Sequence, residues 1–153
     1  MEWTALVSTL VGGGIATLSA GSLEFWRSKR QRVDQSTENR RVLYGSYLAV
    51  LSETRHTLGS LARARDMQSA ERAAAVWDAY VQCISRRYEV EITAPTQVVA
   101  ATENTHHAFR DLCVAVADGV TNDSDTYAQL RQAYKEAHAL LRRAMRSDLG
   151  AEF

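Results

Sequence analysis

Two Glu-x-x-His pairs are the residues of this sequence whose types and spacing could hold a metal ion. They are Glu53 with His56 and Glu103 with His106. In ferritin-like bundles, two helices that each carry such a pair bind two metal ions together with two further glutamates. The chain also contains further carboxylates that could complete such a site, at Glu89, Glu91 and Glu136. A membrane-bound metal-dependent or redox protein with a Glu/His site is therefore one hypothesis.

The spacing of the apolar residues argues against this metal site. Successive residues of a helix are rotated by about 100° around its axis. His56 then lies nearly opposite the apolar stripe that contains Tyr47, and Glu103 lies well outside the stripe that contains Phe109, although His106 is nearer the edge of that stripe. Ligands that point away from a core cannot share a site inside it. We therefore expect no catalytic, metal-binding or cofactor-binding residues and no cofactor.

The remaining reactive side chains indicate no chemistry either. Cys83 and Cys113 lack Cys-x-x-Cys spacing, and we expect free, partly buried thiols. We interpret His106 and His107 as a histidine pair at the surface or at its boundary. Because no nucleophile with an adjacent base and an orienting group is visible, the sequence predicts a protein that is not an enzyme.

The longest apolar segment of the chain, residues 3–23, contains no charged side chain. A helix of this length is about as long as a bilayer's hydrocarbon core is thick. Residues 1–26 are therefore predicted to form a transmembrane anchor. Aromatic and basic side chains that favour a membrane interface flank the segment, at Trp3, Trp26, Arg27, Lys29, Arg30 and Arg32.

Two alternatives to the anchor remain open. A secretory signal peptide would leave an exported helical protein after cleavage, but its positive charge should precede the apolar run, whereas here it follows. A buried core helix is disfavoured because the run Gly12 to Gly14 weakens a helix in water, while glycine is common in spanning helices.

Charge sets the predicted orientation. Residues 27–41 hold six basic and two acidic side chains, although the whole chain has a net charge of zero. Because basic residues beside a span stay on the cytoplasmic side, we expect a single-pass protein of the cell (inner) membrane, with its N-terminus outside and its C-terminal domain in the cytoplasm. This basic stalk would face the anionic lipids of the bilayer. No nucleic acid is expected, because a DNA reader would carry more basic residues along its body.

Small residues recur four positions apart within the predicted span. Such stripes allow two helices to approach closely, and they predict a homo-oligomer. The predicted helix-association residues are Gly12, Gly13, Ala16, Thr17, Ala20 and Gly21.

The rest of the chain has helical apolar spacing throughout, which predicts an all-α protein with an antiparallel helical bundle over residues 42–149 and a tail at 150–153. The first helix should run from the span to Arg65, the second should begin at Gln68 or Ser69, the third should hold Pro95 in its first turn, and the fourth should end at Gly150. For the second helix, the spacing predicts the inward residues Ala73, Val76, Trp77, Tyr80, Ile84 and Tyr88. For the third, it predicts Val98, Thr102, Thr105, Phe109, Leu112, Cys113 and Val116.

The order of these segments resembles a set of uncharacterised small actinobacterial single-pass membrane proteins with a C-terminal helical domain. The residues that carry the resemblance are Met1, Glu2 and Trp3, then Arg40, Arg41, Tyr44 and Tyr47, and finally Ala94 and Pro95. The resemblance implies a single span, a basic stretch and a helical domain, and it implies no activity. The sequence thus predicts a membrane-tethered helical interaction or scaffold module, which binds itself or an unknown protein partner.

Overall fold

All of the regular secondary structure in the described part of the chain is helical. The computed structural model describes residues 35–151. The chain is helical from residue 35 to residue 61, which we call the first helix, and then in α2 (Ser69–Thr93), α3 (Thr96–Ala117) and α4 (Asp125–Asp148). The predicted all-α fold is confirmed for these residues.

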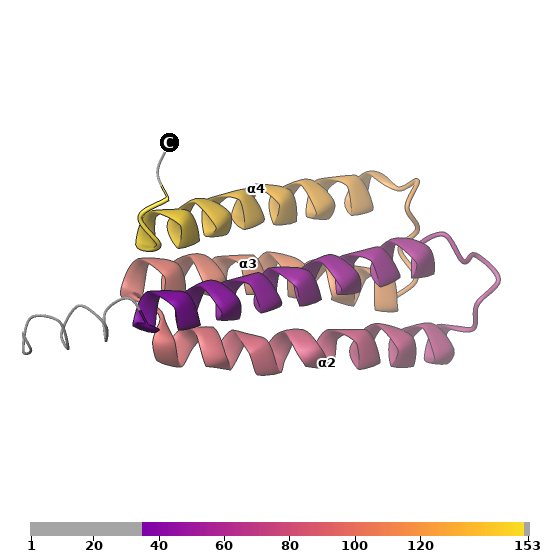
Figure 1. The fold of residues 1–153 in the computed structure, drawn as a ribbon. Helices are drawn as coiled ribbons and strands as arrows, with labels where there is room; N and C mark the ends of the chain where they lie inside the picture. The colour runs from indigo at the N-terminus through magenta and orange to yellow at the C-terminus, as the bar shows by residue number, and fades with distance from the viewer. Residues whose placement is uncertain (1–34, 152–153) are drawn as a thin grey trace, which may run out of the picture. The chain divides into compact units, whose positions relative to one another are not determined.

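Successive helices run in opposite directions, as Figure 1 shows. α3 packs against both α2 and α4. The first helix completes the bundle: the Thr54 hydroxyl donates to the Ala79 carbonyl of α2 at 3.1 Å, and the Tyr44 hydroxyl donates to the Asp148 carboxylate of α4 at 2.8 Å. The groove between the first helix and α4 is therefore opposite the groove between α2 and α3. The expected up-and-down bundle is confirmed.

The predicted anchor lies outside the described residues, as do its interface residues and its small-residue stripes. The structure describes only part of the predicted stalk, from residue 35 onward. Arg40 is the first residue of the compact unit that contains the bundle. None of the helices within residues 35–151 combines the length and the apolar character needed to cross a bilayer.

The turns between helices follow from a few local contacts. The Ser124 hydroxyl accepts the Tyr127 N–H and begins α4, while Gly119, with a φ of 93°, follows the end of α3. Pro95 caps α3 rather than entering its first turn, one residue off the prediction. These three positions set where α3 begins and ends and where α4 begins.

The first helix ends at residue 61, four residues before the predicted end at Arg65. The reason is Arg72 of α2, a buried side chain that no inward stripe predicted. Its guanidinium donates to the Leu61 carbonyl at 2.7 Å and to the Ala64 carbonyl at 2.6 Å. These bonds satisfy carbonyl groups that a longer helix would have used itself.

The core is filled by large side chains from all four described helices. The predicted inward residues of α3 are all buried, and the Phe109 ring packs against the Tyr134 ring with centroids 4.7 Å apart. The prediction for α2 is partly wrong. Val76 and Tyr80 are buried, but Trp77 is 41% exposed and Tyr88 is 53% exposed.

Candidate functional site

The two Glu-x-x-His pairs do not come together in a shared site. Glu53, His56 and Glu103 are exposed, as their helical spacing predicts. Only His106 is buried. Within residues 35–151 the structure contains no group of three or more His, Cys, Asp or Glu side chains arranged to hold a metal ion.

His106 corrects the prediction of a surface or boundary histidine pair. His107 is exposed, but the His106 ring is buried against α2, where the Tyr80 hydroxyl lies 2.9 Å from its Nδ1. Burial, together with the smaller effects of the nearby charges of Arg87, His107 and Arg110, lowers the pKa of His106 to about 4. The neutral His106 ring is thus a core side chain with a hydrogen-bond partner.

The cysteines are free, as predicted, and both are buried. The Cys83 sulfur lies 3.2 Å from the Thr54 hydroxyl. Burial raises the pKa of the Cys113 thiol to about 12, and it also raises the pKa of Cys83. Because a thiolate is the reactive form of cysteine, neither side chain is activated as a nucleophile.

A stripe of apolar side chains runs along the outer surface of α2. Trp77, Val81 and Tyr88 are 41%, 52% and 53% exposed, and Ile84 between them is half-buried. Two exposed alanines extend the row toward the start of the helix. We call these residues the α2 stripe: Ala70, Ala74, Trp77, Val81, Ile84 and Tyr88.

The residues of the α2 stripe are alternately four and three positions apart. This is the spacing of the a and d positions of a coiled coil, in which one helix packs along another over several turns. Within the described part of the chain, no other helix covers the exposed side chains of the stripe. An exposed apolar row of this kind is typical of surfaces that bind a protein, a membrane or a ligand.

A second surface feature is a groove of about 240 Å³ between the first helix and α4. Its apolar lining comes from Leu48 and Tyr134. The polar side chains around it include three cations, and the structure describes no carboxylate among its lining residues. We call this site the basic groove and define it by its polar residues Ser52, Arg55, Lys135, His138 and Arg142.

The charges in the basic groove act on the histidine that they surround. Burial lowers the pKa of His138, and the positive charges of Arg142 and Arg55 lower it further. Burial also raises the pKa of the neighbouring Tyr134 hydroxyl, an effect that Arg55 opposes. The groove therefore disfavours additional positive charge and favours an anion.

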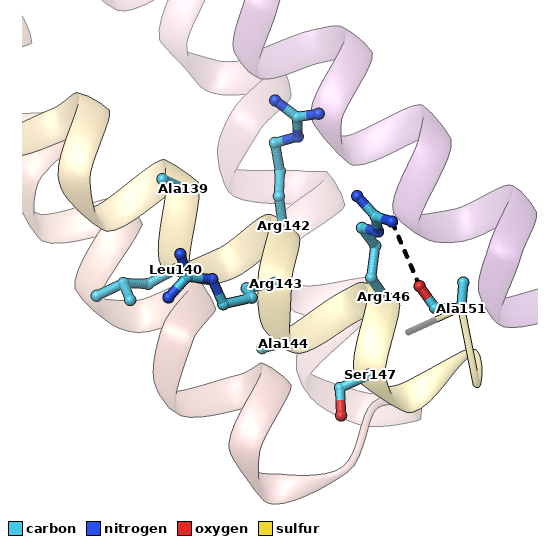
Figure 2. Close-up of a pocket in the computed structure, with 8 residues that line it drawn as sticks. All are labelled: Ala139, Leu140, Arg142, Arg143, Ala144, Arg146, Ser147 and Ala151. Carbon is cyan, nitrogen blue, oxygen red and sulfur yellow. Dashed lines mark hydrogen bonds between the residues drawn. The ribbon is translucent and has the colours of Figure 1, made fainter. Parts of the chain in front are cut away.

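The C-terminal half of α4 carries further arginines, which Figure 2 shows. Arg142 and Arg146 extend toward the first helix in this view, whereas Arg143 extends away from it. The Arg146 guanidinium donates to the Ala151 carbonyl at 3.4 Å. The open depression here, about 710 Å³, is lined by α4 and Ala151, so it is a broad surface rather than a site enclosed by two helices.

The sequence did contain signals for both surfaces. α2 has one apolar stripe through Val76 and Cys83 and a second one through Trp77 and Val81, more than one core-facing side requires. The basic groove brings together residues of two helices that are far apart in the sequence. Its signal was that Arg55, Lys135 and Arg142 have no carboxylate three or four positions away, the spacing that brings side chains together on a helix.

No protein-family model, no curated protein and no solved structure matches this chain. Within residues 35–151 the chain is an all-helical bundle with an exposed apolar stripe along α2 and a basic groove between the first helix and α4.

Proposed function

We propose that this chain is a membrane-tethered helical interaction module that pairs with a second copy of itself through the α2 stripe. The observation that carries the proposal is the exposure of Trp77, Val81 and Tyr88 at coiled-coil spacing. The tether rests on the sequence of residues 3–23, which has the length and the basic flank of a membrane anchor.

Burial of the α2 stripe supplies the driving force for pairing. Each Å² of apolar surface removed from water contributes about 25 cal/mol. Aromatic side chains such as Trp77 and Tyr88 bury large areas and are enriched among residues that dominate interfaces. In a single chain the described helices do not cover the stripe, so its exposed apolar side chains remain in contact with water.

A second copy is the partner whose surface matches the stripe. A coiled-coil seam requires apolar residues at the same spacing on the partner helix. The other large apolar side chains exposed within residues 35–151 are Ile92, one turn after Tyr88 on α2, and Val42, Val114 and Leu140, which lie singly on the three other helices. The α2 stripe of a second chain offers the matching spacing without any further protein.

Anchoring favours pairing because it raises the effective concentration of one chain near another. Two chains inserted in one membrane in the same direction are related by an axis along the membrane normal. A pair of α2 helices that runs along this axis is parallel. Val81 would then lie beside Val81 of the second copy.

The pairing is tested by the molar mass of the full chain in detergent micelles, compared between Val81→Glu and Val42→Glu. Both valines are exposed, at 52% and 65%, so neither change should unfold the bundle. We expect a dimer for the wild type and for Val42→Glu, and a monomer for Val81→Glu. An unchanged dimer for Val81→Glu would exclude the α2 stripe as the interface.

The tether is tested separately by the intact mass of the mature chain and by a reporter fused to its C-terminus. A retained N-terminus and a cytoplasmic reporter are expected. A chain shortened near residue 22, with an exported reporter, would instead indicate signal cleavage.

A further inference from the structure

We propose that the basic groove between the first helix and α4 binds a phosphate group. This site is distinct from the α2 stripe, which lies on another helix, so either proposal can fail without the other. The argument rests on four properties of the groove: its unbalanced charge, its donors, its size and its histidine.

The cations of the groove are not balanced by carboxylates in the described structure. Elsewhere on the bundle, surface arginines do form ion pairs, as Arg65 does with Asp123 and Arg86 with Glu89, each at 2.7 Å. Within residues 35–151 no such ion pair involves the three cations of the groove. Their own helices supply no carboxylate three or four positions away from them, the spacing that usually balances a surface cation.

The positive charges of the groove lie close enough together to affect the same histidine, His138. The positive charges of Arg142, from α4, and Arg55, from the first helix, both lower the pKa of His138. Lys135 lines the same groove one helical turn before His138. Cations gathered in a cleft with an apolar lining attract and concentrate anions.

The donors of the groove fit a phosphate monoester better than a carboxylate. Such a phosphate carries a charge between −1.5 and −2 and three strong acceptor oxygens, as a general property of the group. Arg55 and Arg142 each provide planar guanidinium N–H groups, Lys135 provides an ammonium, and Ser52 provides a hydroxyl. Three positive charges would remain largely uncompensated beside a singly charged carboxylate.

The size of the groove limits what it can enclose. Its volume of about 240 Å³ is below the range of roughly 300–1,000 Å³ that is typical of sites for whole organic ligands. A phosphate group fits this space, and the remainder of a larger ligand would extend into solvent. The source of the group is then either a soluble phosphate compound or a phospholipid headgroup.

His138 provides a direct readout of binding. The groups that face it are Tyr134, Lys135 and Arg142 on α4, together with Ser52 and Arg55 on the first helix. A bound dianion would offset the cations that disfavour protonation of the ring. Phosphate should therefore raise the pKa of His138 toward its ordinary value.

The experiment is an NMR pH titration of the histidine rings in the full chain in detergent micelles, with and without inorganic phosphate. We expect a saturable change at His138 and an upward shift of its pKa, while His56 on the outer face of the first helix is unaffected. A second arm replaces inorganic phosphate with phosphatidic acid in the micelles. A response in either arm supports the site, and the arm that responds identifies the source.

Two arginine variants separate a defined site from general positive charge. Arg142→Gln should weaken phosphate binding about tenfold or more, the effect of losing a charge-assisted hydrogen bond. Arg143→Gln removes the same charge from the neighbouring position, which does not line the groove, and should retain binding. Equal loss in both variants would overturn the proposal, as would a His138 ring that responds to neither phosphate source. Binding of heparin without binding of phosphate would also overturn it, and would indicate an extended surface for polyanions.

Discussion

The Tyr80 hydroxyl lies 2.9 Å from Nδ1 of His106, and the two rings stack with centroids 5.6 Å apart. This contact joins α2 to α3 inside the bundle. A neutral imidazole can accept the hydroxyl hydrogen or donate to the hydroxyl oxygen, whereas a protonated ring can only donate, and burial opposes its charge. The packing of α2 against α3 is therefore linked to the protonation of a single buried histidine.

The stability of the bundle should fall in acid because of this histidine. The unfolded His106 takes up a proton near its ordinary pKa of 6.5, whereas burial lowers the pKa of the folded ring to about 4. Between these pH values the unfolded state holds more protons, so the free energy of unfolding decreases as the pH falls. The slope contributed by one such group is at most about 1.4 kcal/mol per pH unit.

Denaturant unfolding between pH 4 and 7 measures this slope. His106→Gln keeps an acceptor for Tyr80 but cannot titrate, so its slope should be smaller than that of the wild type. His107→Gln changes an exposed neighbour and should leave the slope unchanged. If His106→Gln kept the full slope, other groups would be responsible for the acid sensitivity.

Two buried tyrosine hydroxyls should differ in their contribution to stability. The hydroxyl of Tyr47 is buried and has no hydrogen-bond partner among the described residues. Tyr47→Phe should leave the free energy of unfolding unchanged or raise it by about 1 kcal/mol. Tyr80→Phe should lower it by about 1 kcal/mol, because His106 loses its partner. Equal losses in the two variants, measured by denaturant unfolding, would contradict this difference.

Arg72 should be the arginine on which the connection between the first helix and α2 depends. It is 4% exposed and donates to the carbonyls of Leu61 and Ala64. Arg72→Met retains the apolar stem but removes the donor of the Ala64 carbonyl and leaves the Leu61 carbonyl with only the Ala64 N–H, which should cost about 3 kcal/mol. Arg63→Met, at an exposed position nearby, should change the stability by no more than about 0.5 kcal/mol. Similar losses at both positions would show that the Arg72 hydrogen bonds contribute little.

The predictability of this fold from its sequence differs from helix to helix. α3 has a single apolar stripe, and the predicted inward residues from Val98 to Val116 are all buried. α2 has two adjacent stripes, and periodicity alone could not separate the core residue Tyr80 from the exposed Trp77 and Tyr88. One sequence alone does not show which of the two apolar stripes of α2 faces the core of the bundle.

Contacts between distant segments were beyond sequence reasoning. The position of His106 at the edge of its stripe left its burial open, and that burial depends on Tyr80 of another helix. From the sequence alone, Arg72 would be predicted at the surface. Its burial follows from its hydrogen bonds to the turn between the first helix and α2. The basic groove likewise requires the first helix and α4 to lie side by side, which brings Arg55 near His138.

Disulfide crosslinking of the full chain in membranes tests the central claim most directly, by comparing Val81→Cys with Gln82→Cys. Val81 belongs to the α2 stripe, whereas Gln82 is the next residue, exposed and rotated by about 100° away from it. The native Cys83 and Cys113 are buried and should not compete. Pairing of parallel α2 helices predicts rapid formation of a covalent dimer by Val81→Cys and little by Gln82→Cys. Equal or faster crosslinking of Gln82→Cys would contradict pairing through the α2 stripe.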